Sequence, residues 1–249
     1  MSLPLDQHQV EIERNRRAWE EKPLLREIYA GFYRRILGLL DGAVPGRVVE
    51  IGSGIGNLRA HLPGAICTDL FPNPWLDLVC DGYELPFRDG SLSHLILFDV
   101  FHHLQRPAAF LREARRVLHP AGRVILFEPY LSLASLPVYG WLHHEPLGLG
   151  RPVDLGERAP SPRGYYAAQG NATRLFFQPE ARRCGEGWEV FHAEALASFS
   201  YLFSGGFSKP AAYPLAWLPA CRRLDSLLSR FPRLFGARCL VGLRRGGGV

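Results

Sequence analysis

The stretch from Glu50 to Leu58, Glu-Ile-Gly-Ser-Gly-Ile-Gly-Asn-Leu, decides the fold of this chain of 249 residues. It overlaps the end of a short β-branched run, residues 47–51, which predicts a buried strand. Glycines at positions 52, 54 and 56 let the backbone turn sharply and let a ligand approach the main chain without intervening Cβ atoms. We expect this stretch to end a strand, form a ligand-binding turn and open a helix.

Four further apolar runs each end at an acidic residue. They are 65–68 before Asp69, 77–80 before Asp81, 93–98 before Asp99 and 123–127 before Glu128. Such runs are typical of parallel strands that are buried on both faces and end along one edge of a sheet. A helix is predicted over Pro107–Leu118. The alternation of strands and helices predicts an open, doubly wound α/β sheet, in which ligands bind at the carboxyl edge of the strands.

The flanks of this core are less regular. Apolar residues at three- and four-residue steps predict an amphipathic helix over 24–40, with a polar, Arg-rich helix before it. The segment 131–187 shows no clean periodicity, and we interpret it as an insertion that covers the mouth of the sheet. Late strands are expected at 188–191 and 239–243, with a helix near 215–230.

Several motifs occur in order along the core. They are VVEIGSGIGN at 48–57, the acid of CTDL at 67–70, CDGYELPFRDGSLSHLILFDVFHHL at 80–104 and RRVLHPAGRVILFEP at 115–129. In this order they resemble the class I S-adenosylmethionine-dependent methyltransferases, and specifically the type 11 subgroup. The resemblance covers about residues 46–130. It implies a Rossmann-like, mostly parallel, seven-stranded sheet and S-adenosylmethionine as cofactor.

The resemblance also implies a division of the chain. We expect one domain, 1–249, composed of N-terminal helices (1–42), a cofactor-binding core (46–130), a variable substrate lid (131–187) and C-terminal strands with a helix (188–245).

The resemblance assigns roles along the strand ends. Gly52, Gly54 and Gly56 are expected to shape the turn for the methionine end of the cofactor, and Glu50 to orient that turn or meet the amino group. Asp69, with the adjoining Leu70, is expected to hold the ribose. Asp81 and the backbone of Gly82 and Tyr83 are expected to hold the adenine. Phe98 and Asp99 are expected to flank the methionine moiety. Taken singly, a glycine turn or a strand-ending acid is as often structural.

Candidate general bases are few. They lie in the pair His102–His103 after the fourth strand and in His143-His144-Glu145 within the insertion, from which His103 and His144 are our candidates. Neighbouring histidines on a helix point in different directions, so both members of a pair are not expected to serve one site. Packing or capping, and an exposed loop, are the alternatives. We predict no metal site, because His143 and His144 are sequential and no further spaced ligand follows.

Three aromatic residues outside the motifs are further candidates. Tyr165, Tyr166 and Trp188 carry rings that can stack on a flat or sugar-like acceptor, although aromatic residues more often belong to a core.

Composition bounds the remaining alternatives. Hydrophobic residues make up 47% and charged residues 21%, which excludes a mostly disordered chain. Five cysteines without a CxxC pair fit reduced thiols, and no signal or spanning segment is recognised, so a soluble, cytoplasmic protein is expected. The net charge of +5 lies wholly in residues 126–249, which hold 14 basic and 9 acidic side chains.

These features leave the acceptor open. Because the basic residues are dispersed, a small-molecule or glycan- or lipid-type acceptor is favoured over RNA, and nucleic acid is a possible but not favoured partner. A nicotinamide-dependent oxidoreductase is a second hypothesis, against which Asn57 stands where GxGxxG requires glycine. A non-catalytic scaffold is a third. The oligomeric state, the pathway and the use of a general base are not predicted.

Overall fold

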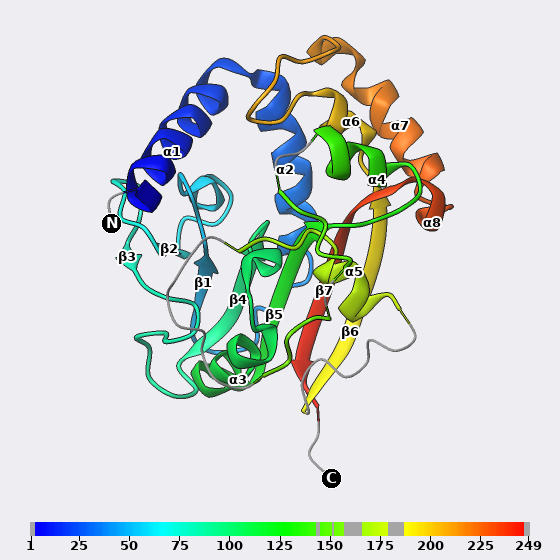
Figure 1. The fold of residues 1–249 in the computed structure, drawn as a ribbon. Coiled ribbons are helices and arrows are strands. Elements are labelled where there is room, and N and C mark those ends of the chain that lie inside the picture. The colour runs from blue at the N-terminus through cyan, green and yellow to red at the C-terminus, as the bar shows by residue number, and fades with distance from the viewer. Residues whose placement is uncertain (1–2, 143–144, 151, 157–165, 179–186, 247–249) are drawn as a thin grey trace.

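A seven-stranded sheet forms the centre of the molecule (Figure 1). The structure is a computed structural model, and it describes residues 3–142, 145–150, 152–156, 166–178 and 187–246. The strand order is β3-β2-β1-β4-β5-β7-β6, in which the first five strands are parallel and β7 is antiparallel to both its neighbours. The predicted doubly wound, mostly parallel sheet of seven strands is confirmed.

The strands lie close to the predicted apolar runs. They are β1 (Arg47–Ile51), β2 (Ile66–Asp69), β3 (Leu78–Val79), β4 (Leu92–Phe98), β5 (Leu118–Pro129), β6 (Trp188–Ala197) and β7 (Gly236–Arg245). Every residue of β4 is buried, as expected for a central strand covered on both faces. The late strands β6 and β7 are longer than predicted, because each continues along its neighbour for the whole length of the sheet.

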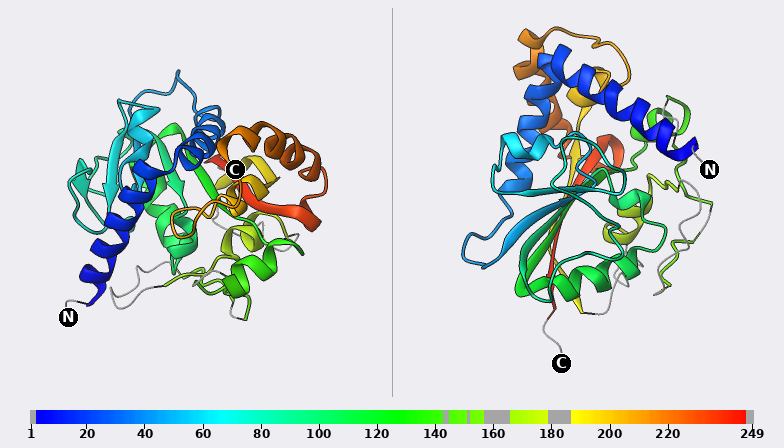
Figure 2. Two further views of the ribbon diagram at one scale, coloured as in Figure 1. Left: turned by 90° about the horizontal axis from the view of Figure 1, so that it is seen from above. Right: turned by 90° about the vertical axis from the view of Figure 1, so that its left-hand side faces the viewer.

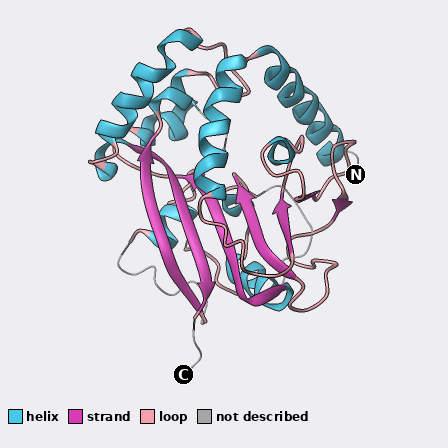
Figure 3. Ribbon diagram, turned by 180° about the vertical axis from the view of Figure 1, so that it is seen from behind, coloured by secondary structure: helices cyan, strands magenta, loops and turns pink. Residues whose placement is uncertain are grey.

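Helices cover both faces of the sheet. On one face lies α2 (Pro23–Leu37), as the view from behind shows (Figure 3). Its apolar side packs against Ile96, Phe98 and Phe127. On the other face lie α3 (Pro107–Val117) and α5 (Asn171–Phe176). Alternate residues of β4 and β5 therefore enter two separate cores.

The remaining helices gather at the carboxyl edge of the parallel strands (Figures 1 and 2). They are α1 (Leu3–Glu21), α4 (Ser135–Pro137), α6 (Phe199–Phe203), α7 (Leu218–Leu228) and α8 (Pro232–Phe235). The expected helices at the N-terminus and near 215–230 are thus present. Within the described residues, no helix is long and apolar enough to cross a bilayer.

The helix expected after the glycine turn is present but short, since residues Asn57–Ala60 form only a 3-10 helix, η1. Pro63 follows it closely, and a proline disfavours the helical conformation of the preceding residue. The chain therefore turns into β2 after one turn of helix. This shortening leaves the glycine turn without the helix N-terminus that commonly binds a phosphate group.

The described parts of the insertion lie against the loop that follows β4. The amide of Ala168 donates to the carbonyl of His102 at 2.9 Å, and Arg106 pairs with Asp154 at 2.9 Å. Ala172 and Leu175 of α5 enter the core. The insertion is therefore partly helical and anchored in the core, whereas its sequence showed no periodicity.

Candidate functional site

The carboxyl ends of four neighbouring strands meet at one edge of the sheet. Ile51 of β1 lies opposite Thr68 of β2 and Leu97 of β4, and Asp69 lies opposite Val79 of β3. The residues that follow these pairs therefore occupy one rim. They are the glycine turn, the loop after Asp69, Asp81 and Asp99.

The glycine turn has a backbone that only glycine adopts easily. Gly52, Gly54 and Gly56 have φ angles of 67°, 54° and 70°. A Cβ atom at Gly52 would lie 2.4 Å from Cγ2 of Val100, so a larger residue has no room there. At Gly54, in contrast, the nearest atom to an added Cβ is Cδ1 of Ile12 at 4.0 Å. The turn thus packs tightly at its start and leaves space beside Gly54 for a ligand.

Asp69 holds this turn in place. Its Oδ2 accepts a hydrogen bond from the amide of Gly54 at 2.9 Å, and its Oδ1 accepts one from the amide of Leu70 at 2.7 Å. Asn73 holds the other side of the same residue, because its Nδ2 donates to the Gly54 carbonyl at 3.0 Å. A carboxylate has about four lone-pair sites, so Asp69 retains capacity for a ligand hydroxyl while it fixes the turn.

Two carboxylate oxygens at this rim lack a hydrogen-bond partner among the described residues. They are Oε2 of Glu50 and Oδ1 of Asp99, and both are shielded from water. Burial and the nearby Asp69 together raise the pKa of Glu50 to about 8, against the opposing effect of hydrogen bonds from Ser53 and Tyr33. A buried acceptor without a partner is costly. The arrangement therefore favours a ligand that brings a hydrogen-bond donor or a positive charge.

Asp99 is held by a buried arginine. Its other oxygen, Oδ2, accepts a hydrogen bond from Arg238 of β7 at 2.6 Å, and Asp99 itself has a φ of 57°, which is uncommon for a non-glycine residue. The Arg238 guanidinium lies 5.0 Å from the ring centroid of Phe127 and 5.2 Å from that of Tyr201. The side chain of Arg238 is only 3% exposed. Its charge and its ring contacts together fix Asp99 at the rim.

Asp81 and Tyr83 form the far side of the rim. Asp81 is exposed, and its Oδ1 accepts a hydrogen bond from the amide of Tyr83 at 2.9 Å. The Tyr83 hydroxyl accepts from the amide of Arg106 at 3.1 Å. These bonds tie the loop after β3 to the start of α3.

A buried histidine lies at the end of β4. His102 belongs to the short 3-10 helix η2 (Phe101–His103), and its Nδ1 lies 2.6 Å from Oε2 of Glu128. Glu128 is fully buried, and its Oε1 accepts hydrogen bonds from the amides of Val100 and Phe101 at 2.9 and 2.7 Å. Although burial opposes the charge, Glu128 and Glu145 raise the pKa of His102 to about 10.

His103 turns toward the same acidic residue of the insertion. Its Nδ1 lies 3.0 Å from the carbonyl oxygen of Tyr166, and its Nε2 lies 3.4 Å from Oε1 of Glu145. The Nε2 of His102 lies 3.3 Å from Oε2 of the same carboxylate. Burial and the neighbouring His102 lower the pKa of His103. The prediction that adjacent histidines cannot serve one site is therefore wrong: their rings are only 4.1 Å apart, and both reach Glu145.

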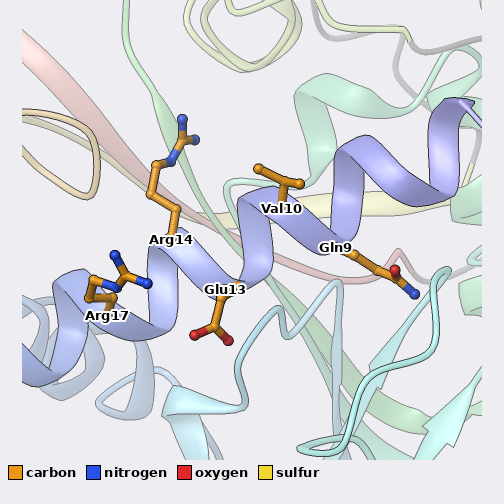
Figure 4. A pocket seen from close by; sticks show the side chains of 5 residues that line it. All are labelled: Gln9, Val10, Glu13, Arg14 and Arg17. Carbon is orange, nitrogen blue, oxygen red and sulfur yellow. The ribbon is translucent and has the colours of Figure 1, made fainter.

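Helix α1 lies over the glycine turn, which Ile12 contacts. Five of its side chains line a hollow of about 560 Å³ (Figure 4), namely Gln9, Val10, Glu13, Arg14 and Arg17. None of the strand-end acids lines this hollow among the described residues. We therefore place the candidate site at the rim of the sheet, beneath α1, rather than in this hollow.

Comparison with known families agrees with this geometry. Residues 49–126 match the family model described as a methyltransferase domain. The matched segment covers less than half of the chain and contains residues 49–51 of β1, the glycine turn, Asp69, Asp81, Asp99 and most of β5. It resembles the class I methyltransferases, whose cofactor is S-adenosylmethionine.

The curated proteins that this chain resembles carry different acceptors in their names. A human protein named probable tRNA methyltransferase 9B is 29% identical over 119 residues, which cover 42% of this chain and 26% of the relative. Human thiol S-methyltransferase TMT1B is 28% identical over 128 residues, 42% of this chain and 52% of the relative. The chain thus spans only about a quarter to a half of the length of these curated relatives.

A solved structure extends the likeness to the whole fold. A chain of the solved complex between the Haloferax volcanii Trm112 methyltransferase activator and the putative methyltransferase matches 98% of this chain over 99% of its own length, with a TM-score of 0.56 and 18% identity. The N-terminal helices and the late strands β6 and β7 therefore belong to a known fold.

The structure brings most of the predicted cofactor residues to one rim. Glu50, the three glycines, Asp69, Leu70, Phe98 and Asp99 surround the ends of β1, β2 and β4, and Asp81, Gly82 and Tyr83 follow β3. His103 lies beside them, but the other candidate base, His144, is outside the described residues, as are His143 and Tyr165. Trp188 pairs with Arg245 at the opposite end of the sheet and packs against the core, in line with the core alternative for its ring.

The sequence analysis did not identify three residues of the candidate site. They are Tyr33, Glu128 in its role as partner of His102, and Arg238. Arg238 carried a signal, because a single arginine within the apolar run of β7 must find a buried partner. Tyr33 resembled any other apolar position of its helix.

The raised pKa of Glu50 makes cofactor binding depend on pH. At neutral pH the free protein holds Glu50 protonated, and a cationic amino group nearby favours the carboxylate. We expect the affinity for S-adenosylhomocysteine to rise between about pH 6 and 8, by at most about tenfold per pH unit, and then to level off. Calorimetric titration across this range measures it.

The variant Glu50→Gln is the control for this effect. Glutamine does not titrate, so the pH dependence of binding that remains in this variant comes from the ligand. It should bind more weakly than the wild type above pH 8 and show a flatter profile. Because the folded-state pKa lies above the unfolded value, wild-type stability should also fall as pH rises from 4.5 toward 8, relative to the variant. Parallel profiles for the two proteins would show that Glu50 does not face the amino group.

Proposed function

We propose that this protein is an S-adenosylmethionine-dependent methyltransferase that transfers a methyl group to an oxygen, nitrogen or carbon atom of a small-molecule or glycan- or lipid-type acceptor. The observation that carries the proposal is the pair of buried carboxylate oxygens without described partners, on Glu50 and Asp99, beside the space at Gly54. This corner of hydrogen-bond acceptors fits the amino group at the methionine end of the cofactor, whose positive charge would favour the carboxylate form of Glu50.

The remaining rim residues fit the rest of the cofactor in the same order. Asp69, held beside the glycine turn, would accept hydrogen bonds from the ribose hydroxyls, and the exposed apolar Leu70 would cover the adenosine. Asp81, with the backbone of Gly82 and Tyr83, would meet the adenine. Phe98 lies beside the proposed methionine position, where its ring stacks on Tyr29 at 5.0 Å.

The chemistry asks little of the protein beyond alignment. The cofactor supplies an activated methyl group on a sulfonium, which a nucleophile displaces in line. The protein must hold the two reactants at near-attack distance and exclude water. For an oxygen or nitrogen acceptor, His103 would take the proton: the Tyr166 carbonyl holds its Nδ1, and its lowered pKa keeps the ring neutral at pH 7.

Two observations bear on the acceptor. The insertion that contacts the loop after β4 would form the acceptor side of the site, since Tyr166 and Glu145 come from it. The excess of basic side chains in residues 126–249 fits a phosphorylated acceptor, and the name of one relative adds tRNA as a test substrate. Their dispersion along the chain still favours a small acceptor.

The oxidoreductase hypothesis is weakened by the fold. A dinucleotide needs a helix N-terminus after the glycine turn to bind its pyrophosphate, and here only the four residues of η1 follow. A fluorescence titration with NADH should therefore show no specific binding.

Calorimetry with S-adenosylhomocysteine tests the proposed function directly. We expect one site per chain, and transfer of labelled methyl groups to an acceptor found among polar small molecules, lipid-linked glycans and RNA. Absence of cofactor binding would overturn the proposal. Binding without transfer to any class of acceptor would favour the scaffold hypothesis, and transfer to RNA alone would overturn the choice of a small acceptor.

A further inference from the structure

Two imidazole nitrogens and one carboxylate converge beside the proposed methyl-transfer site. The Nε2 atoms of His102 and His103 lie 3.3 and 3.4 Å from the two oxygens of Glu145. One ligand atom from each of the three residues lies within 4.8 Å of the others. In a tetrahedral zinc site with bonds of about 2.0–2.1 Å, neighbouring ligand atoms lie about 3.3 Å apart. The two separations match that spacing.

Both histidines are oriented from behind by hydrogen-bond acceptors. Glu128 lies 2.6 Å from Nδ1 of His102, and the carbonyl of Tyr166 lies 3.0 Å from Nδ1 of His103. An acceptor at Nδ1 orients the ring and directs Nε2 toward the opposite side, and a metal ion at Nε2 of His102 would take the place of the proton there. Metal-binding histidines almost always have such a partner, often a carboxylate. Here each of the two rings has one, and both Nε2 atoms face the same carboxylate.

The other possible donor set of this region is less suitable. It combines Asp99, His102 and Glu128. Glu128 already accepts hydrogen bonds from the amides of Val100 and Phe101, and Asp99 is paired with Arg238. These carboxylates therefore serve as supports. Glu145 also has another partner, because its Oε2 accepts a hydrogen bond from Nε2 of Gln169, but its two oxygens lie near the Nε2 atoms of both histidines.

We propose that His102, His103 and Glu145 bind a divalent first-row transition-metal ion, for which Zn²⁺ is the best fit. Two imidazoles and one carboxylate suit zinc and its neighbours rather than Mg²⁺, which prefers oxygen ligands. Three protein ligands leave a coordination position open, as in catalytic rather than structural zinc sites. The side chain of His103 is 30% exposed, so the site is accessible from one side.

This site uses the same nitrogen that the metal-free protein would use as a base. A bound metal would occupy the lone pair of His103 Nε2. An acceptor oxygen in the open position would then have a lowered pKa and would lose its proton to solvent water. The metal site does not depend on the cofactor-binding residues. A titration with metal therefore tests the metal site, and a titration with cofactor tests the proposed function, independently of each other.

The test is a titration of the full, tag-free chain with ZnCl₂ after removal of bound metal by a chelator. We expect one zinc ion per chain by calorimetry. With Co²⁺ as a probe, we expect a visible absorption band typical of four- or five-coordinate cobalt, whereas MgCl₂ should give no heat. His103→Ala and Glu145→Gln should each weaken zinc binding by at least about tenfold, and Glu128→Gln by about 10- to 100-fold, because it orients a ligand without touching the metal.

The matched control is His192→Ala. His192 also lies near a glutamate, with Nε2 3.7 Å from Glu194, but it has no second histidine within the described cluster. This variant should bind zinc like the wild type. His103→Ala removes a partly exposed ring, and binding of S-adenosylhomocysteine by each variant shows that its fold is intact. The proposal is overturned if the wild type binds no zinc, or if His103→Ala and Glu145→Gln bind it as tightly as the wild type does.

Discussion

Replacing Asp69 with alanine should weaken the binding of S-adenosylhomocysteine by about 100-fold. Two losses add to this effect. A buried ribose would lose a charged hydrogen-bond acceptor, which costs about 1.5–3 kcal/mol. The glycine turn would also lose the bond from the Gly54 amide, which holds it at 2.9 Å. Calorimetric titration measures the change, and far-ultraviolet circular dichroism monitors the fold.

Two further variants separate these losses. Asp69→Asn keeps an oxygen for the Gly54 amide and should lose less affinity than Asp69→Ala. Asp77→Ala removes a carboxylate that caps a neighbouring amide, that of Cys67 at 2.8 Å, and pairs with Arg59. It disturbs the same region without removing a proposed ligand contact and should change the affinity by less than about threefold. Equal effects of Asp69→Ala and Asp77→Ala would show that Asp69 does not hold the ribose.

Replacing Arg238 with methionine should lower the free energy of unfolding by about 3 kcal/mol. The variant keeps an apolar chain of similar length but removes the 2.6 Å bond to Asp99 and the contacts with the surrounding rings. Removing one partner of a buried pair leaves the other charge without compensation, and about 3–5 kcal/mol is typical. We expect the lower end, because the side chain of Asp99 is 31% exposed. Chemical denaturation measures the difference.

Arg244→Met on the same strand is the matched control. Arg244 pairs with Glu189 at 2.6 Å, but both side chains are about half exposed. Its removal should cost less than about 1 kcal/mol. The double variant Arg238→Met/Asp99→Asn should regain part of the lost stability, since no unpaired charge remains. Equal destabilisation by the two single variants would contradict a special role for the buried pair.

The parallel half of the fold was predictable because its signals are local. Each apolar run that ends in an acidic residue is a strand whose end lies at the rim. The motifs along 48–129 indicated the arrangement of these strands. The length of β6 was not predictable, since its exposed residues alternate irregularly and only pairing with β7 extends it. The helix after the glycine turn is short because Pro63 disfavours the helical conformation of the residue before it.

The positions of the candidate residues along the sheet edge were predictable, but the orientations of their side chains were not. The acidic residues lie at the strand ends, as expected, because the end of each strand fixes the position of the residue that follows it. The rings of His102 and His103 converge because η2 is a single tight turn and because Glu128, Tyr166 and Glu145 hold them from distant parts of the chain. Contacts of this kind leave no spacing signal in a sequence.

The position of Arg238 has a consequence for how the protein matures during synthesis. Asp99 is translated early, within the segment that the family model covers, whereas its cationic partner belongs to the final strand. A nascent polypeptide still attached to the ribosome therefore has every glycine and acid of the rim, but not the guanidinium that holds Asp99 in its unusual backbone conformation. The corner around Asp99 is completed only when β7 has been made, and a chain cut short before β7 would carry the motifs of residues 48–129 without the partner of Asp99.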